Sequence, residues 1–132
     1  MLFRSPGTCV TCVMEGVRPV LAEIQALVVP SSLGNPRRVS NGFDYSRSML
    51  LLAVLEKRGG LMVGGCDAYL NVIGGLYLEE PAADLAAILA LASSFRDKPV
   101  PNDLAAIGEV GLTGELRAAS ALGQRLLSLI HI

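Results

Sequence analysis

The segment from residue 82 to residue 95 is the feature that most limits how this chain can fold. Almost every side chain in it is apolar or small, so a helix over these residues has hardly any polar surface. Glu79-Glu80-Pro81 precedes it, and acids and proline are favoured at a helix N-terminus, while Arg96-Asp97-Lys98-Pro99 ends it. A helix that is apolar all round is buried. We therefore expect a central helix, covered on most sides by the rest of the domain.

Two alternating segments near the start of the chain predict a β-hairpin. Residues 8–14 and 18–28 alternate along their length, and the Glu15-Gly16 pair between them is typical of a turn. In the second segment the even-numbered positions are apolar, which gives a strand one face to bury. These positions are Val20, Ala22, Ile24, Ala26 and Val28.

The remaining segments mix short strands with helices. We expect strands over residues 37–40, 67–73 and 104–110, a helix that begins after an N-cap at Asp44, and a last helix from about Ser120. A hairpin mixed with helices in this order is typical of an α+β layer fold rather than of a regular parallel sheet. The 132 residues suffice for one domain with a substantial core.

Composition and charge exclude several classes of protein. Hydrophobic residues make up 52% of the chain, but no apolar run approaches the ~18 residues of a membrane span, so no membrane partner is expected. The net charge of −1 argues against strong binding to a polyanion. The first 60 residues nevertheless hold seven basic against four acidic side chains. Any contact with nucleic acid is therefore expected to come from that half.

The three cysteines predict packed thiols. An odd number of cysteines without a secretory segment favours reduced thiols in the cytoplasm. Cys9 and Cys12 form a CxxC pair, but no second pair of cysteines or histidines completes a zinc site. Positions three apart on a strand also point to opposite faces. We therefore expect Cys9, Cys12 and Cys66 to hold no metal.

Several ordered segments of the chain match one protein family. They cover residues 14–28, 34–38, 52–58 and 80–86, and the strongest run is ASSFRDKPVP over 92–101, continued by GEVGLTGE over 108–115. Over about residues 7–126 the chain resembles the C-terminal, Lon-protease-like domain of the RadA (Sms) family of bacterial DNA-repair ATPases. The resemblance implies a single domain over residues 1–132, with the ribosomal S5 domain 2-like α+β fold that the proteolytic domain of Lon shares.

The resemblance also implies a longer parent protein. Members of the family carry a zinc module and a RecA-like ATPase, and act in the cytoplasm as hexameric branch-migration motors in homologous recombination. The implied partners are copies of the protein itself in a ring, DNA and the recombinase RecA. This chain has neither a GxxxxGK[ST] loop to hold a triphosphate nor a four-cysteine module. ATP, magnesium and zinc are thus expected only in other parts of the parent, with no cofactor in this chain.

Lon proteases use a serine nucleophile and a lysine base, and the resemblance places both positions. Aligned on Gly108-Glu109-Val110, the serine position is Ala82 and the lysine position is Arg125. Alanine offers no nucleophile, and arginine stays protonated. Asp84 replaces a glycine and puts negative charge where an oxyanion would develop. We therefore expect no enzyme activity. An active Ser–Lys peptidase is the alternative, and a small-molecule-binding S5-like domain is another, for which no phosphate-cradling loop is apparent.

Arg37 and Arg38, with Arg47 nearby in the sequence, form the basic cluster of most interest. One interpretation is contact with DNA phosphates or with a neighbouring subunit of a ring. The other is a solvated loop. The family resemblance makes a role in a ring around DNA worth testing.

Both ends of the chain depart from the family. Residues 1–5 and 128–132 do not match what the family has there, and the domain normally continues past Arg125 with a further strand and helix. We therefore expect a C-terminally truncated domain, with an exposed sheet edge and exposed apolar surface.

Overall fold

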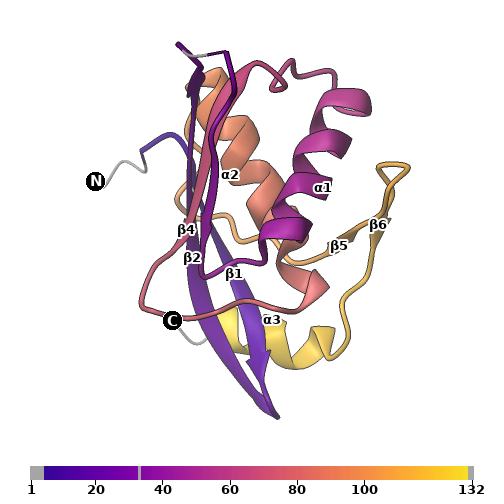
Figure 1. The fold of residues 1–132 in the computed structure, drawn as a ribbon. Helices are drawn as coiled ribbons and strands as arrows, with labels where there is room; N and C mark the ends of the chain where they lie inside the picture. Colours follow the sequence, from indigo (N-terminus) through magenta and orange to yellow (C-terminus); the bar gives the residue numbers. More distant parts are fainter. Residues whose placement is uncertain (1–4, 33, 131–132) are drawn as a thin grey trace.

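The computed structural model describes residues 5–32 and 34–130, so residues 1–4 of the atypical N-terminal end (1–5) and residues 131–132 of the atypical C-terminal end (128–132) lie outside it. Strands and helices follow one another as a hairpin, a short strand, a helix, a strand, a second helix, a small hairpin and a last helix (Figure 1). The elements are β1 (Thr8–Glu15), β2 (Arg18–Pro30), β3 (Arg38–Asn41), α1 (Tyr45–Lys57), β4 (Cys66–Val72), η1 (Pro81–Ala83), α2 (Asp84–Arg96), β5 (Glu109–Val110), β6 (Leu116–Arg117) and α3 (Leu122–Ile130).

Four strands form the main sheet, in the order β1-β2-β4-β3. The β1–β2 and β2–β4 pairs are antiparallel, and the β3–β4 pair at the edge is parallel. The turn between β1 and β2 contains Gly16 at φ 65°, a conformation that glycine adopts without strain. The predicted hairpin is confirmed, and the apolar even-numbered residues of β2 from Ala22 to Val28 are its buried face.

Helices α1 and α2 lie side by side on one face of this sheet (Figure 1). The Asp44 side chain caps α1 by accepting a hydrogen bond of 2.9 Å from the Arg47 backbone N–H, as the sequence predicted. Helix α2 crosses β1 and β2, and Ala86, Ala87 and Leu91 are completely buried in it. The expected central helix is therefore confirmed, with a short 3-10 turn, η1, ahead of it.

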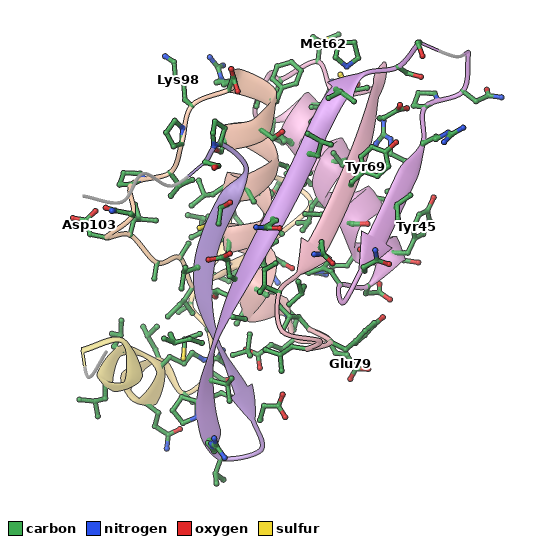
Figure 2. The ribbon with its side chains drawn as sticks, turned by 90° about the vertical axis from the view of Figure 1, so that its left-hand side faces the viewer. Tyr45, Met62, Tyr69, Glu79, Lys98 and Asp103 are labelled. Carbon is green, nitrogen blue, oxygen red and sulfur yellow. The ribbon has the colours of Figure 1, made fainter. Side chains whose placement is uncertain are left out.

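The opposite face of the sheet is open over β2, β4 and β3. Figure 2 looks onto it, with Tyr69 near its middle and α1 and α2 behind. Antiparallel sheets often keep one face against the core and one in solvent. The fold is thus an α+β domain, as predicted. Among the helices that the structure describes, none is long and apolar enough to cross a membrane.

The predicted strand over residues 104–110 is wrong for most of its length. Only Glu109 and Val110 form a strand, β5, which pairs with β6. Upstream, the Ala106 N–H donates to the Val10 carbonyl, while the Gly108 N–H donates to the Ala82 carbonyl, both at 2.9 Å. The backbone of this segment therefore bonds to different elements in turn. An apolar pattern alone does not distinguish such a connection from a strand.

Candidate functional site

The two positions that the sequence assigned to a degenerate catalytic dyad lie in one region of the fold. Ala82 is in η1 and is 6% exposed, and Arg125 is in α3 and is 2% exposed. The Arg125 guanidinium contacts the carboxylate of Glu80, which is the N-cap residue of η1. Ala82 supplies no hydroxyl there. Arg125, which the resemblance aligns with the lysine base, is bound to other parts of the domain.

Arg125 holds α3 against the sheet through hydrogen bonds to three oxygens. Its Nε donates to the Ser120 carbonyl at 2.8 Å, and its Nη1 donates to the Cys12 carbonyl of β1 at 2.9 Å. The same Nη1 makes a close ion pair with Glu80 Oε1. A guanidinium does not release its proton at any usable pH, so it cannot serve as a general base.

Glu80 and Arg125 together cover the free edge of β1. The second carboxylate oxygen of Glu80 accepts a hydrogen bond of 3.3 Å from the Met14 N–H, two residues beyond the Cys12 carbonyl that Arg125 binds. Further along the same edge, Ala106 bonds to Val10. An uncovered strand edge is a template for wrong pairing. In this region the ion pair satisfies backbone groups of β1 that no neighbouring strand reaches.

Asp84 forms the second ion pair on the other side of Ala82. Its carboxylate is completely buried and accepts a hydrogen bond of 2.8 Å from Arg47 Nε and a close one from Arg47 Nη2. The Val110 N–H donates to it as well, at 3.1 Å. A two-pronged arginine–carboxylate contact is among the stronger hydrogen-bonded pairs in proteins. The hydrogen bond to Asp84 is also the largest cause that raises the pKa of Arg47 above its ordinary value.

The two pairs change the interpretation of the acidic residues. The Glu79-Glu80 pair is accounted for in sequence terms by the helix dipole, and Asp84 by its repulsion of an oxyanion. In the structure Glu80 and Asp84 each have a specific arginine partner. The sequence carried a signal for this: in the alignment that the family resemblance implies, Asp84 replaces a glycine and Arg125 replaces a lysine. Each of the two acidic side chains, Glu80 and Asp84, is thus paired with a basic side chain from another element.

The three candidate contact arginines do not form one cluster. Arg37 and Arg38 lie at the start of β3, and Arg47 lies in the first turn of α1, beyond the other end of that strand. Arg37 has an exposed side chain. Arg38 donates from Nη2 to the carbonyls of Val63 and Gly64, at 3.1 and 3.3 Å. Because Arg47 is bound to Asp84, only Arg37 presents a largely exposed side chain.

The cysteines take the positions expected of packed thiols. Cys9 and Cys12 are both 0% exposed in β1, where they lie opposite Ile24 and Leu21 of β2 and so point to opposite faces of the sheet. Cys66 is buried in β4. Within residues 5–32 and 34–130, no group of three cysteine, histidine or acidic side chains is arranged to hold a metal ion.

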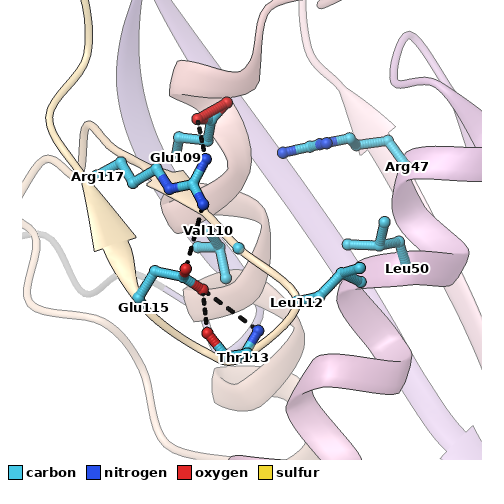
Figure 3. A pocket seen from close by; sticks show the side chains of 9 residues that line it. Arg47, Leu50, Glu109, Val110, Leu112, Thr113, Glu115 and Arg117 are labelled. Carbon is cyan, nitrogen blue, oxygen red and sulfur yellow. Dashed lines mark hydrogen bonds and ion pairs between the residues drawn. The ribbon is translucent and has the colours of Figure 1, made fainter.

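A cavity of about 420 Å³ lies between α1 and the β5–β6 hairpin (Figure 3). Arg47 and Leu50 of α1 line one side of it, and Arg117 lies between Glu109 and Glu115 on the other. The Thr113 hydroxyl, the Glu115 backbone N–H and Arg117 hold the pKa of the Glu115 carboxyl at about 2. Two arginines and two glutamates line the cavity, so it has no excess of basic over acidic side chains to attract a phosphate.

The chain is similar in sequence to proteins named DNA repair protein RadA. It is 56% identical over 122 residues to DNA repair protein RadA of Bacillus subtilis, 49% over 125 residues to that of Streptococcus pneumoniae, and 52% over 125 residues to that of Listeria monocytogenes. These matches cover 92–95% of the chain. The chain belongs to the RadA family. It spans 27–30% of the length of these relatives. No profile of a known protein family matches it.

Membership of the RadA family confirms the resemblance that the sequence segments indicated. The two ion pairs of the chain have the geometry of side chains that hold elements together.

Proposed function

We propose that this chain is a non-catalytic scaffold domain of a RadA-type DNA repair protein, in which it makes contacts between the subunits of a hexameric ring. The proposal extends to a fold of the ribosomal S5 domain 2-like class, similar to the proteolytic domain of Lon. The Arg125 guanidinium carries it: at the place where a peptidase needs a neutral lysine, the structure has a 2%-exposed cation bound to three oxygens. A side chain so placed stabilises an architecture and cannot activate a nucleophile.

The peptidase alternative can be tested directly. The unmodified chain should not hydrolyse fluorescently quenched casein. Ala82 has no nucleophilic atom, and the Arg125 guanidinium stays protonated, so it cannot accept a proton from a nucleophile. The double variant Ala82→Ser/Arg125→Lys should also be inactive, since an ammonium beside the Glu80 carboxylate is held in its protonated form. Hydrolysis by the unmodified chain that persists after repurification, and disappears in an unfolded sample, would refute the proposal.

The parent protein supplies the chemistry that this domain lacks. A RecA-like ATPase with ATP and magnesium, and a zinc module, belong in this proposal to parts of the relatives that the chain does not span. The relatives bear the name DNA repair protein, and we propose the same process, through branch migration during homologous recombination, with RecA as a further partner. The thiols of Cys9, Cys12 and Cys66, which form no disulfide among the described residues, suit the cytoplasm, where the chromosome is repaired.

Arg37 is the residue through which we propose a contact with DNA or with a neighbouring subunit. It is exposed, and its backbone N–H is fixed by a hydrogen bond of 2.7 Å to Asp67 Oδ1, so the loop presents it in a defined place. Arg38 is partly held by Val63 and Gly64 and Arg47 by Asp84, so both serve the fold first.

The Arg37→Glu variant of the full-length protein separates the two possibilities. If Arg37 binds a phosphate, DNA affinity falls, the slope of its salt dependence decreases by roughly one for each phosphate that is no longer bound, and the ring stays intact. If it bridges subunits, light scattering without DNA shows dissociation. The matched control is Arg18→Glu, an exposed arginine at the tip of the β1–β2 hairpin. An intact ring with unchanged DNA affinity would contradict both roles.

A further inference from the structure

The sheet face that α1 and α2 leave uncovered has an unusual surface (Figure 2). Two rows of side chains cross three strands. Leu27, Tyr69 and Val39 form an apolar row, since Leu27 and Val39 are the neighbours of Tyr69 on β2 and β3. Leu27 is 54% exposed and Val39 is 42% exposed. Beside this row runs a row of exposed amides, Gln25, Asn71 and Asn41. We call these six residues the open face.

The composition of the open face is that of a protein interface. None of the six side chains is charged, and charged residues are depleted at the centres of interfaces, whereas tyrosine is enriched. Charges occur where the face ends, with Asp67 opposite Val29 at one end and Glu23 opposite Val10 at the other. An apolar row with amide neighbours and a charged rim suits a polypeptide surface better than a nucleic acid, which attracts basic side chains.

The segment before β1 reaches the domain beside this face. Residues 5–8 form one wall of a hollow of about 270 Å³, and Gln25, Leu27, Tyr69 and Asn71 line the rest of it. Figure 1 shows the segment that leads into β1 on the side of the sheet away from α1 and α2. A polypeptide that precedes residue 5 therefore enters the domain next to the open face.

Gly7 fixes the direction of this approach. Its N–H donates to Ser93 Oγ at 2.8 Å, and its carbonyl accepts from the Ala26 N–H at 2.6 Å. Its φ of 94° is one that glycine tolerates, and a Cβ here would lie 2.2 Å from the Ala26 carbonyl oxygen. The segment is thus attached both to α2 and to β2, and it cannot swing freely away from the sheet.

We propose that the open face is the docking surface for the polypeptide that precedes residue 5 in the full-length RadA-type protein. This inference rests on the proposed function, in which the chain is one domain of a longer protein, as its 27–30% share of the relatives' length suggests. A tethered segment is present at a high effective concentration, so a modest patch of apolar and amide groups suffices to hold it. The docked surface is expected to be apolar at its centre, with amide or hydroxyl groups for Gln25, Asn71 and Asn41.

Cysteine labelling of the full-length protein tests the proposal when mass spectrometry reads the label on the peptide that holds the introduced cysteine, so that the zinc-module cysteines of the parent do not contribute. The three cysteines of this chain are all buried and give little background. Leu27→Cys, in the apolar row, and Gln25→Cys, in the amide row, report on the open face. Val17→Cys, at a position 88% exposed at the tip of the hairpin, is the matched control. Maleimide labelling rates are measured for each variant in the 132-residue chain and in the full-length protein. Two positions are used because a cysteine at Leu27 could itself weaken the docking.

The expected result is that at least one open-face cysteine is labelled roughly tenfold more slowly or less in the full-length protein than in the 132-residue chain, while Val17→Cys is labelled equally in both. Equal rates at Leu27→Cys and Gln25→Cys in both proteins would overturn the proposal. Labelling of the 132-residue chain that slows as its own concentration rises would overturn it in favour of a second copy. The Arg37→Glu experiment reads DNA affinity and ring assembly, so failure of the proposed function is seen separately.

Discussion

Thr11 is completely buried on β1, and its Oγ1 has no hydrogen-bond partner within the described part of the chain. A buried hydroxyl without a partner costs about 1–3 kcal/mol of desolvation. Thr11→Val keeps the shape and removes that cost, so we expect the free energy of unfolding to rise by about 1 kcal/mol. Urea denaturation followed by circular dichroism measures it. A loss of stability would show that the hydroxyl has a partner, such as a bound water.

At the same scale, Arg47 shows why the partner of a single charged residue cannot be predicted from the sequence. Arg47 is close to Arg37 and Arg38 in the sequence, which suggests that the three form one basic cluster. Its partner, Asp84, lies 37 residues away and is completely buried. Only the packing of α1 against α2 brings the two together. Charge patterning indicates which residues need a partner, but the fold decides which partner each receives.

Helix α3 is attached to the domain in an unusual way. Its arginine is buried, while Leu122 and Leu126 are 38% and 47% exposed. We therefore expect Arg125→Ala to destabilise the protein by about 3–5 kcal/mol, because Glu80 would be left without its cation and the Cys12 carbonyl without its donor. Leu126→Ala, the matched control, should cost less than about 1 kcal/mol, as exposed positions do. Thermal melting of both variants gives the comparison, and the reverse order would show that α3 is held by its leucines.

The β5–β6 hairpin contains a carboxylate, that of Glu115, whose pKa is lowered to about 2. The Thr113 hydroxyl is the largest of the groups that lower the pKa of Glu115 to about 2. Thr113→Ala should move the pKa of Glu115 back toward 4.5, as followed by NMR titration of its carboxyl carbon. Since the folded pKa is below the unfolded one, this contribution to stability is complete above about pH 4.5 and is lost as the pH falls toward 2. An unchanged titration in the variant would show that another group holds the carboxylate.

Strands and helices were predicted correctly where a single hydrophobic periodicity continued through the whole segment. Alternation over β1 and β2 predicted the hairpin, and the apolar circumference of residues 82–95 predicted the buried helix, which begins at Asp84 after the η1 turn. Prediction failed over residues 104–108, because a backbone that bonds first to Val10 and then to Ala82 has no repeating environment for its side chains to match. The degenerate dyad was placed by resemblance alone. The two ion pairs on either side of Ala82 could be identified only from the structure.

At the scale of the whole molecule, α1 and α2 pack against one face of the main sheet. The stability of the domain depends on that layer. Leu91 in α2 is 0% exposed, and an aspartate there would bury a charge without a partner. We expect Leu91→Asp to unfold the entire domain at room temperature, with loss of its circular dichroism signal, because α2 is central to the layer that covers one face of the main sheet. The matched control is Leu27→Asp on the open face, which is 54% exposed and should change the free energy of unfolding by less than about 1 kcal/mol in the 132-residue chain. If both variants unfold, the open face is already covered in this chain by another copy; if neither does, α2 is not the centre of the core.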